Sequence, residues 1–373
     1  MDKNLHIVTH DVPWPADFGG VVDLFYKIKS LHQEGIKIHL HCFTSKRAEQ
    51  PLLNRYCESV TYYSRKKKLS ILPYSIPYIV LSRSDDTLLK DLLKDDYPVL
   101  LEGIHCTYHL FKGKLNNKKV IVRLHNAEYN YYKHLFKLET GIFKKIYFYI
   151  ESLLLKKYER KLSKLATFLT VSKTDETLYR SEFNANKLLF LPVFIPWNKI
   201  KCQTGSGSFC LYHGNLSVNE NEKAALWLLE EVFNTLKIPF VIAGKSPSSH
   251  LKKMVYLNRH TCLVENPTEY ELDDLIQKAQ INILPSFNKT GVKLKLLNAL
   301  FNGRHCLVNE EGVEGSGTAS LCTIAKDPIA FIKLTEVLFD LPFTEEDINK
   351  RKSILETLYN NKENAKQIIT LLY

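Results

Sequence analysis

The 373-residue sequence has no apolar run long enough to cross a membrane and no segment typical of a secretory signal. A membrane-spanning helix needs about 20 consecutive apolar residues, whereas the most apolar stretch, residues 71–81, is interrupted by two prolines. The N-terminus, MDKNLHIVTH, lacks an apolar signal core and a small-residue cleavage site. We therefore expect a cytoplasmic protein that neither spans a membrane nor is secreted by the usual route.

Paired-cysteine motifs are also absent. The eight cysteines are dispersed, and several lie in apolar, strand-like runs, a setting typical of buried reduced thiols rather than of disulfides or a metal site. Zinc-finger spacing, glycine-aromatic RNA-binding signatures and heptads are missing as well, so nucleic acid is not an expected partner. The formal net charge of +11 nevertheless calls for anionic partners, which leaves phosphorylated small molecules and anionic membrane surfaces.

Apolar strand-like segments alternate with helical ones along the whole chain. The order of strand, glycine loop, helix and strand over residues 5–43 is a βαβ unit, which demands a parallel sheet. At this length two domains are expected, so we predict an α/β fold of two doubly wound parallel sheets with a ligand cleft between them. The expected strands are residues 5–9, 36–43, 60–63, 99–102, 120–124, 168–171, 188–191, 209–213, 240–243, 261–264, 281–284 and 305–308.

Linker-like composition occurs near the middle of the chain. Pro192 and Pro196 are followed by the GSGS run at residues 205–208, and small residues of this kind favour a flexible connection. We therefore predict a first domain over residues 1–200 and a second over 201–345. The last segment, residues 346–373, is predicted to be a C-terminal helix.

Residues 281–303, INILPSFNKTGVKLKLLNALFNG, read as a short buried strand, a loop containing Gly291, and a helix. A helix N-terminus presents free N–H groups and a positive dipole end, which suit a phosphate. Lys289, Lys293 and Lys295 add three cations to this stretch. The alternative is an ordinary βα unit with a solvated lysine face.

Two further positions are ligand candidates in the first domain. His125 directly follows the predicted strand 120–124, and α/β sheets bind ligands at the carboxyl ends of their strands. Gly19 and Gly20 end the first loop and would allow a ligand to approach the backbone closely. The alternatives are a structural histidine and a tight turn required by packing.

Two basic segments are candidates for contact with an anionic membrane. The run from Arg65 to Lys68 is either a solvated turn or a contact for lipid headgroups. The predicted helix over residues 142–165 carries seven cations against two glutamates. It either packs its apolar stripe on the sheet with a wet basic face or lies at a membrane interface. The expected stripe comprises Phe143, Ile146, Tyr147, Ile150, Leu153, Leu154, Tyr158, Leu162 and Leu165.

The motifs, in this order, resemble those of GT-B glycosyltransferases, nearest to the family 4 (glycosyl transferases group 1) bacterial enzymes. The resemblance covers nearly the whole chain. It implies two Rossmann-like domains facing across a cleft, an acceptor site mainly in the first, a nucleotide-sugar site mainly in the second, and a last helix that crosses back to the first. The matching pieces are the loop ending at Gly19 and Gly20, HNAE (125–128), SKTDE (172–176), HGNLSVNEN (213–221), VIAG (241–244), and residues 284–303 with the LVNEEGVEG that follows at 307–315.

Residue roles follow from the resemblance by position. His125 would lie near the donor sugar as the catalytic residue, and Gly20 would face the donor phosphates. Members of this class need no metal or other cofactor, because backbone amides and cations neutralise the diphosphate leaving group. The implied donor-binding residues are Gly19, Gly20, Gly214, Asn215, Lys245, Val264, Asn266, Thr290, Gly291, Val292, Lys293, Lys295 and Asn298.

The chain departs from the family pattern at two of these positions. Retaining members usually carry two glutamates eight residues apart, where this sequence has Thr290 and Asn298. Asn298 can still hydrogen-bond a ribose without charge, whereas Thr290 cannot replace a carboxylate on the sugar. The cations often found after residues 213–221 are also missing, so Lys293 or Lys295 is expected to replace them.

The predicted function is metal-independent transfer of a hexose from a UDP- or GDP-sugar to a glycan or lipid-linked acceptor in surface polysaccharide biosynthesis. The enzyme would be cytoplasmic and peripheral on the inner face of the membrane. One alternative is a non-catalytic GT-B partner protein. Another is a GT-B-type sugar-nucleotide epimerase, which would need more converging acid and base groups than His125 and His213. A periplasmic binding protein would share the duplication but would need an export signal.

Overall fold

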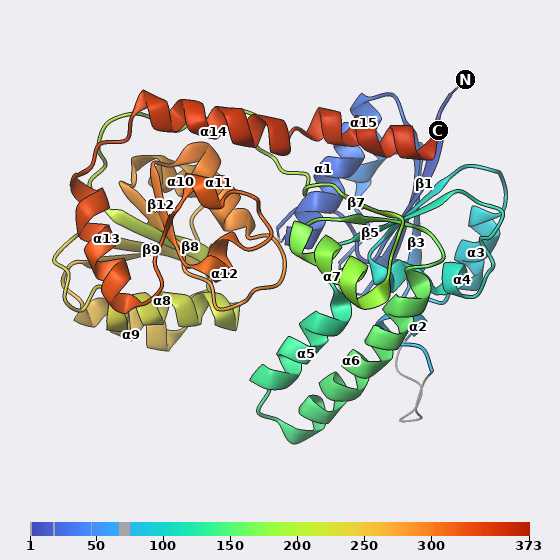
Figure 1. The fold of residues 1–373 in the computed structure, drawn as a ribbon, viewed down its shortest axis with the longest axis horizontal. Helices are drawn as coiled ribbons and strands as arrows, with labels where there is room; N and C mark the ends of the chain where they lie inside the picture. The colour runs from blue at the N-terminus through green and yellow to red at the C-terminus, as the bar shows by residue number, and fades with distance from the viewer. Residues whose placement is uncertain (1, 18, 46, 67–74) are drawn as a thin grey trace. The chain divides into compact units, whose positions relative to one another are not determined.

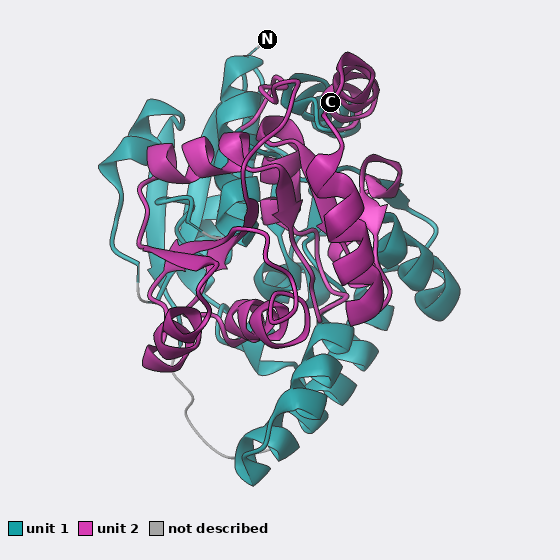
Figure 2. Ribbon diagram, turned by 90° about the vertical axis from the view of Figure 1, so that its left-hand side faces the viewer, with its two compact units in different colours: residues 1–196, 359–373 teal, residues 197–358 magenta. Residues whose placement is uncertain are grey.

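A computed structural model describes residues 2–17, 19–45, 47–66 and 75–373. The chain divides into two compact units (Figure 2). Unit 1 comprises Met1–Pro196 and Tyr359–Tyr373, and unit 2 comprises Trp197–Leu358. Each unit is built on one parallel sheet with helices packed against it (Figure 1), so the predicted fold class is confirmed.

The sheet of unit 1 has the strand order β3-β2-β1-β4-β5-β6-β7. Its central strands are buried almost throughout, because helices cover both faces of a doubly wound sheet and the strands are therefore continuous apolar runs. The strands are β1 (Asn4–Thr9), β2 (Lys37–Thr44), β3 (Ser59–Ser64), β4 (Val99–Glu102), β5 (Val120–Leu124), β6 (Thr167–Thr170) and β7 (Leu188–Phe190).

The helices of unit 1 include one from the C-terminal end of the chain. Ile368 and Leu372 of that helix, α15, share a core cluster with Ile28 and Leu31 of α1. The helices are α1 (Gly19–Gln33), α2 (Tyr78–Leu81), α3 (Asp86–Leu92), α4 (Tyr108–Phe111), α5 (Glu128–Leu138), α6 (Ile142–Leu162), α7 (Lys173–Phe183) and α15 (Asn361–Leu372), with the 3₁₀ turns η1 (Pro51–Arg55) and η2 (Ile104–Cys106).

The sheet of unit 2 has the order β10-β9-β8-β11-β12-β13. Its strands are β8 (Cys210–Asn215), β9 (Phe240–Lys245), β10 (Thr261–Glu265), β11 (Ile281–Ile283), β12 (His305–Val308) and β13 (Thr323–Ile324). Its helices are α8 (Asn219–Glu231), α9 (Ser249–Leu257), α10 (Glu269–Lys278), α11 (Leu294–Asn302), α12 (Glu310–Val313), α13 (Pro328–Asp340) and α14 (Glu345–Leu358), with the 3₁₀ turn η3 (Ala319–Leu321). Within the described residues, none of the helices combines the length and the apolar content that a membrane span requires.

The linker predicted at residues 205–208 is wrong, because this segment is packed into unit 2. Gly205 forms an antiparallel bridge with Phe343. The Gly207 N–H donates to Gln280 Oε1 at 2.6 Å, and a methyl group on Gly207 would lie 2.4 Å from the Gln280 nitrogen. Small residues are present here because the backbones approach closely. The two units divide earlier in the chain, between Pro196 and Trp197.

The C-terminal segment is two helices rather than the single helix predicted over residues 346–373. Helix α14 belongs to unit 2 and α15 to unit 1. The side chain of Asn360 accepts from the Glu363 N–H and so caps the start of α15. This cap between two helical patterns marks the break.

The apolar stripe predicted along residues 142–165 is buried only in part, so the first of the two alternatives, a stripe packed wholly on the sheet, is wrong. Near the C-terminal end of α6, Tyr158 and Leu162 are buried. Towards its N-terminus Phe143 is 87% exposed, and Ile146 and Ile150 are also exposed. The reason is that α5 and α6 pair with each other as a hairpin that extends away from the sheet (Figure 1).

A substitution at Gly207 tests whether residues 205–208 are packed. We expect Gly207→Ala to lower the midpoint of thermal unfolding of the full chain, because an added methyl group must displace backbone and overpacking costs about 1–3 kcal/mol. Ser206→Ala, at the exposed neighbouring position, is the matched control and should leave the midpoint unchanged. Equal midpoints for the two variants would contradict this packing.

Candidate functional site

Polar residues gather at the carboxyl ends of the three central strands of unit 1. His10 follows β1, Gly103 and His105 follow β4, and His125 follows β5. Strands β1, β4 and β5 are neighbours in the sheet, and the strand order changes direction between β1 and β4. Ligands bind at such a switch point in open α/β sheets.

Three imidazoles surround Gly103. A methyl group on Gly103 would lie 3.0 Å from His105 Nδ1, 3.8 Å from His125 Nδ1 and 3.9 Å from His10 Nδ1. Gly103 also has a φ of +80°, which glycine tolerates best. The Nδ1 atoms of His10 and His105 are buried and have no hydrogen-bond partner among the described residues. Because unsatisfied buried polar atoms are uncommon, this edge of the sheet is a candidate functional site.

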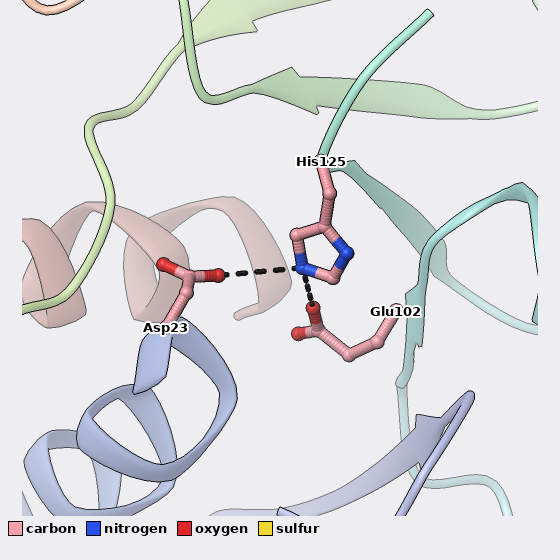
Figure 3. Close-up of side chains that lie close together, drawn as sticks. All are labelled: Asp23, Glu102 and His125. Atoms are coloured by element: carbon pink, nitrogen blue, oxygen red, sulfur yellow. Dashed lines mark ion pairs between the residues drawn. The ribbon is translucent and has the colours of Figure 1, made fainter. Parts of the chain in front are cut away.

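A buried network of charges holds His125 in place. Lys27 of α1 pairs with Asp23 Oδ2 at 2.7 Å and with Glu102 Oε1 at 2.9 Å. Arg123 of β5 pairs with Asp23 Oδ1 at 3.3 Å. His125 Nε2 lies 3.4 Å from Asp23 Oδ2 and 3.3 Å from Glu102 Oε2 (Figure 3). The network therefore links α1, β4 and β5 to one another and to His125.

The charges of this network set the protonation of its members. Burial alone would raise the pKa of Asp23, but Lys27, Arg123 and His125 hold it well below its usual value. Burial alone would lower the pKa of His125, but the neighbouring carboxylates of Asp23 and Glu102 raise it. His125 therefore favours a protonated imidazole whose Nε2 edge faces the two carboxylates.

The oxygen and nitrogen ligands of Asp23, Glu102 and His125 lie within 4.8 Å of one another, as in a metal site. Lys27 Nζ, however, contacts both carboxylates at 2.7 and 2.9 Å. An ammonium group bound to two of the three ligands leaves no place for a divalent cation between them. This group fits a buried ion network better than a metal centre.

The other two histidines of the cluster are neutral bases. Burial holds the pKa of both His10 and His105 well below the usual value, and neighbouring positive charges act in the same direction. Arg83 is one of these charges, and its guanidinium donates to the His10 carbonyl at 3.0 and 3.2 Å. Both rings can accept a hydrogen bond from a ligand hydroxyl.

In unit 2, the predicted donor-binding residues also gather at the carboxyl edge of the sheet. Gly214 and Asn215 end β8, and Lys245 ends β9. Val264 lies in β10, and Asn266 follows it. Residues 290–293 lie between β11 and α11, and Lys295 and Asn298 belong to α11. The structure thus brings residues that are far apart in sequence to one edge of the unit.

Lys293 and Lys295 form a pair of partly buried cations at the start of α11. Lys295 Nζ donates to Tyr212 Oη and Asn221 Oδ1, each at 3.1 Å, and Lys293 Nζ donates to the carbonyls of Thr290 and Gly291. Neither ammonium forms an ion pair within the described part of the chain. Burial lowers the pKa of Lys295 to about 7 and that of Lys293 to about 8. A bound anion at this position would offset the unfavourable free energy of burying the two positive charges.

The loop before α11 is fixed by its own side chains. Asn288 Oδ1 accepts from the N–H and the hydroxyl of Thr290, both at 2.8 Å. Gly291 has a φ of +69°, which favours glycine. Asn298 Oδ1 accepts from Asn302 Nδ2 at 2.6 Å. The loop is therefore stabilised by hydrogen bonds of its own side chains, and the Asn298 oxygen already has a partner on its own helix.

Other predicted residues shape the loops of unit 2. Asn266, with a φ of +50°, accepts from the Ser246 N–H at 2.8 Å. Asn215 Oδ1 accepts from the N–H and hydroxyl of Ser217 at 3.1 and 2.7 Å. Val264 is half-buried against a small core cluster. These side chains already have partners within the protein.

Several residues of the site were not predicted from the sequence. Gly19 and Gly20 were expected in a loop but form the first turn of α1, and Asp23, four residues after Gly19, is the side chain that reaches the network. Charged residues inside apolar runs are the signal that could have pointed to Lys27, Glu102 and Arg123. The residues missed are His10, Asp23, Lys27, Glu102, Gly103, His105 and Arg123 in unit 1, and Tyr212 and Asn221 in unit 2.

Comparisons with known proteins agree with this architecture. Residues 208–340 match the family model described as glycosyl transferases group 1. A Klebsiella pneumoniae protein, described as an uncharacterized 44.6 kDa protein in the cps region, is 30% identical over an alignment of 352 residues, and the match covers 88% of each chain.

Solved structures share the fold at low sequence identity. TarM superposes with a TM-score of 0.68 and 10% identity, covering 100% of this chain and 99% of TarM. A glycosyltransferase from Rickettsia africae gives 0.67 and 11%, covering 99% and 98%. An S. aureus TarM variant in complex with fondaparinux, alpha-GlcNAc-glycerol and UDP gives 0.66 and 10%, covering 99% of each chain.

The two parallel-sheet α/β units, each with its polar residues at the carboxyl edge, define a protein of the GT-B class. The chain belongs to the glycosyl transferases group 1 family of sugar transferases.

The pKa of His125 can be tested through its carboxylate partner. We expect Glu102→Gln to lower this pKa, because it removes a negative charge 3.3 Å from Nε2. The pKa in the native protein lies above the unfolded value of about 6.5. The stability that His125 contributes is therefore present below about pH 6.5 and is lost as the pH rises through the native pKa.

Histidine-selective NMR titration measures the pKa directly, and thermal unfolding at a series of pH values measures the stability. Glu58→Gln, at an exposed position in unit 1, is the control. A His125 pKa that is equal in the wild type and in Glu102→Gln would contradict this account of the network.

Proposed function

We propose that this protein transfers a hexose from a UDP- or GDP-sugar to a hydroxyl group of a glycan or lipid-linked acceptor, in the biosynthesis of a surface polysaccharide. Membership of the group 1 glycosyl transferases supports the reaction type. The similar K. pneumoniae protein from the cps region supports a role in polysaccharide synthesis, and the UDP complex of a TarM variant supports a nucleotide donor.

The observation that carries the proposal is the cation pair of Lys293 and Lys295. Two partly buried ammonium groups lie beside the start of α11 and donate to neutral oxygens, with the carboxylates of Glu220 and Glu314 as the nearby negative charges. Charge on the diphosphate increases as the sugar leaves, and pre-positioned donors stabilise such charge strongly. In this proposal the two lysines and backbone N–H groups neutralise the leaving group, so the reaction requires no metal ion or cofactor.

In the same proposal His125 is a catalytic residue that contacts the sugar. Asp23 and Glu102 fix its Nε2 edge, which leaves Nδ1, on the side of Gly103, to donate a hydrogen bond to a sugar hydroxyl. Donors fixed in this way need no reorganisation when the reaction occurs.

A panel of UDP- and GDP-sugars with oligosaccharide and lipid-linked acceptors tests the function. Release of the nucleoside diphosphate together with a glycosylated product supports it. The alternative, a non-catalytic partner protein, is favoured by Thr290 and Asn298 in place of the family glutamates. Donor binding without transfer to any acceptor would support that alternative.

Substitution of Lys295 tests the cation pair. We expect Lys295→Ala to lower turnover at least tenfold, because one positioned charge on the leaving group contributes about 3 kcal/mol. Lys289→Ala is the matched control in the same loop, since Lys289 is 71% exposed and faces Glu311 at 3.6 Å. Equal turnover for the two variants would remove Lys295 from the site.

The same pair predicts a pH dependence of donor binding. Lys295 and Lys293, with pKa values of about 7 and about 8, lose their charge as the pH rises. The affinity for a nucleoside diphosphate, measured by calorimetry, should therefore fall between about pH 7 and 9. The fall should be smaller for Lys295→Ala, whereas an affinity independent of pH would contradict the prediction.

We further propose that the protein works in the cytoplasm, at the inner face of the membrane, and that the α5–α6 hairpin contacts anionic lipid. The hairpin extends from the rest of unit 1 (Figures 1 and 2). Glu128, Glu151 and Glu159, three of its four glutamates, are buried, so its surface charge is strongly positive. Its exposed apolar residues are Leu138, Ile142, Phe143, Ile146, Tyr149, Ile150 and Leu153, and its exposed cations are Lys133, Lys137, Lys144, Lys157, Arg160 and Lys161.

The other predicted membrane contact has less support. Lys66 donates to Ser84 Oγ at 3.0 Å, and Arg65 NH2 donates to Ser82 Oγ at 3.5 Å, so both side chains have protein partners. Lys67 and Lys68 lie outside the described residues. The proposal therefore rests on the hairpin.

Vesicle sedimentation tests the hairpin. We expect Phe143→Glu to weaken binding to phosphatidylglycerol vesicles at least tenfold, because burying a Phe side chain contributes about 1.5–3 kcal/mol. Tyr270→Glu, on α10 of unit 2 and 83% exposed in the native protein, is the control and should bind as the wild type does. Wild-type protein that fails to sediment with these vesicles at low salt would overturn the proposal.

A further inference from the structure

Three neighbouring strands of unit 1 carry buried titratable side chains that contact one another. His6 lies on β1, His41 on β2 and Tyr63 on β3, and these strands are adjacent in the sheet. Each of the three residues is only 4% exposed. Strands of a sheet that is covered on both faces are normally apolar, so titratable groups on three successive strands require an explanation.

These side chains form one hydrogen-bonded chain that begins and ends at a carboxylate. His6 Nε2 lies 3.1 Å from Asp95 Oδ1, and His6 Nδ1 lies 2.9 Å from His41 Nε2. His41 Nδ1 lies 2.9 Å from Tyr63 Oη, and Tyr63 Oη lies 2.6 Å from Asp91 Oδ2. Four contacts thus join five side chains, which we call the proton chain.

Both ends of the proton chain belong to the same segment. Asp91 lies in the last turn of α3, and Asp95 follows four residues later, before β4 begins at Val99. The proton chain therefore fastens the end of α3 to three strands of the sheet. The side chains of Asp91 and Asp95 are 20% and 26% exposed, so protons reach the chain from solvent at both ends.

The proton chain holds one proton too few when its carboxylates are ionised and its imidazoles are neutral. Each hydrogen bond needs one proton, so the four contacts need four. Ionised carboxylates only accept, whereas a neutral imidazole and a phenol each donate one proton. His6, His41 and Tyr63 then supply three protons, and one contact brings two lone pairs face to face.

Burial keeps the two imidazoles neutral. It lowers the pKa of His41 to about 3 and that of His6 below its usual value, although the negative charges of Asp95 and Asp91 act in the opposite direction. The fourth proton is therefore absent at neutral pH and binds on acidification, below the ordinary histidine pKa of about 6.5.

The surrounding groups keep the two carboxylates ionised. Lys94 pairs with Asp91 Oδ1 at 2.7 Å, and Lys118 pairs with Asp95 Oδ1 at 3.3 Å. Burial alone would raise the pKa of both carboxyl groups, but hydrogen bonds and these positive charges hold it below the usual value. Among the described residues, the other titratable groups that face the proton chain are His39, Tyr97 and Asp85.

We propose that the proton chain is an acid-operated clamp on α3. At neutral pH the Tyr63 hydroxyl lies between two acceptors, His41 Nδ1 and the Asp91 carboxylate, and donates to only one of them. On acidification one proton from solvent binds to the chain and fills the fourth contact, so α3 is held more tightly to the sheet. No other bond forms or breaks, and the clamp is independent of the proposed sugar transfer.

The clamp acts on a segment that also reaches the candidate site of unit 1. Asp85 caps the start of α3, and Arg83, two residues earlier, donates to the His10 carbonyl at 3.0 and 3.2 Å. A helix fastened at both ends supports this contact more firmly. Acidity is thereby coupled to the residues that follow β1.

Amide hydrogen exchange measures the clamp in the full-length protein. The Leu93 N–H, at the end of α3, donates to the Leu89 carbonyl at 3.1 Å. We expect its protection factor to rise about fivefold as the pH falls below about 6.5, as one added hydrogen bond implies. The Phe233 N–H of unit 2, bonded to the Leu228 carbonyl, is the reference for changes in global stability.

Histidine-selective NMR measures the added proton over the same pH range. We expect His6 and His41 to titrate together with one apparent pKa, because the two rings share a proton. Two separate titrations, or a Leu93 protection factor that does not change with pH in the wild type, would overturn the clamp.

Asp91→Asn should fill the chain without an added proton. The new side-chain amide donates to Tyr63 Oη, which frees the hydroxyl proton for His41 Nδ1, and the imidazole protons fill the remaining contacts. Leu93 protection should then be high and independent of pH. Lys94→Gln removes the same ion pair but keeps the Asp91 carboxylate, so it is the matched control and should behave as the wild type does.

Tyr63→Phe tests the same arithmetic by deletion. It removes one proton and two contacts, so the two imidazole protons fill the two contacts that remain. Leu93 protection should be low and independent of pH in this variant, with thermal unfolding confirming that it is folded. A wild-type rise of Leu93 protection on acidification in either Tyr63→Phe or Asp91→Asn would show that the proton acts elsewhere and would overturn the proposal.

Discussion

The buried charge network of unit 1 is the interaction on which its candidate site depends. Lys27 and Arg123 are fully buried and are paired with Asp23 and Glu102, which are also buried. Removing charges from water is expensive, and removing one member of such a network leaves the others uncompensated at a cost of about 3–5 kcal/mol. The network also reaches the chain beyond β7, because Arg123 donates to the Leu191 and Pro192 carbonyls and the Phe194 N–H donates to Asp23. The same contacts that join α1, β4 and β5 therefore orient His125.

The two units place their candidate site residues in the same way but with different chemical groups. In each, parallel strands end together and polar residues collect at that edge. Unit 1 places imidazoles and a carboxyl group there, and unit 2 places lysines and side-chain amides. In the proposed reaction, the histidines of unit 1 hydrogen-bond the sugar, and the lysines of unit 2 neutralise the phosphates. The low pKa values of the lysines and the high pKa of Glu128 have the same main cause, which is burial of the charged form.

The sequence allowed the fold to be predicted well, because buried parallel strands are continuous apolar runs and every expected strand is present. Of the strands in the described parts of the chain, only β13, with two residues, was not predicted. Local composition predicted the structure poorly where contacts between residues distant in the sequence determine it. Residues 205–208 resemble a linker but pack against Gln280. The stripe on α6 could not reveal that only its C-terminal part joins the core of unit 1 and that α5 lies beside the rest. Asp23, Glu102 and Arg123 converge from distant positions, and no spacing in the chain encodes that convergence. The position of Lys295 could be predicted, whereas its bonds to Tyr212 and Asn221 could not.

In the proposed function, the lysine pair of unit 2 would also couple nucleotide binding to proton uptake. A group with a pKa near 7 is only partly protonated at physiological pH, and an adjacent diphosphate would raise that pKa. Each bound nucleotide would then draw a fraction of a proton from the medium, and that fraction would return to solution when the nucleoside diphosphate dissociates. The heat of binding would consequently vary with the ionisation enthalpy of the buffer. Product release would be assisted at alkaline pH, where the lysines give up their protons and hold the leaving nucleotide less tightly.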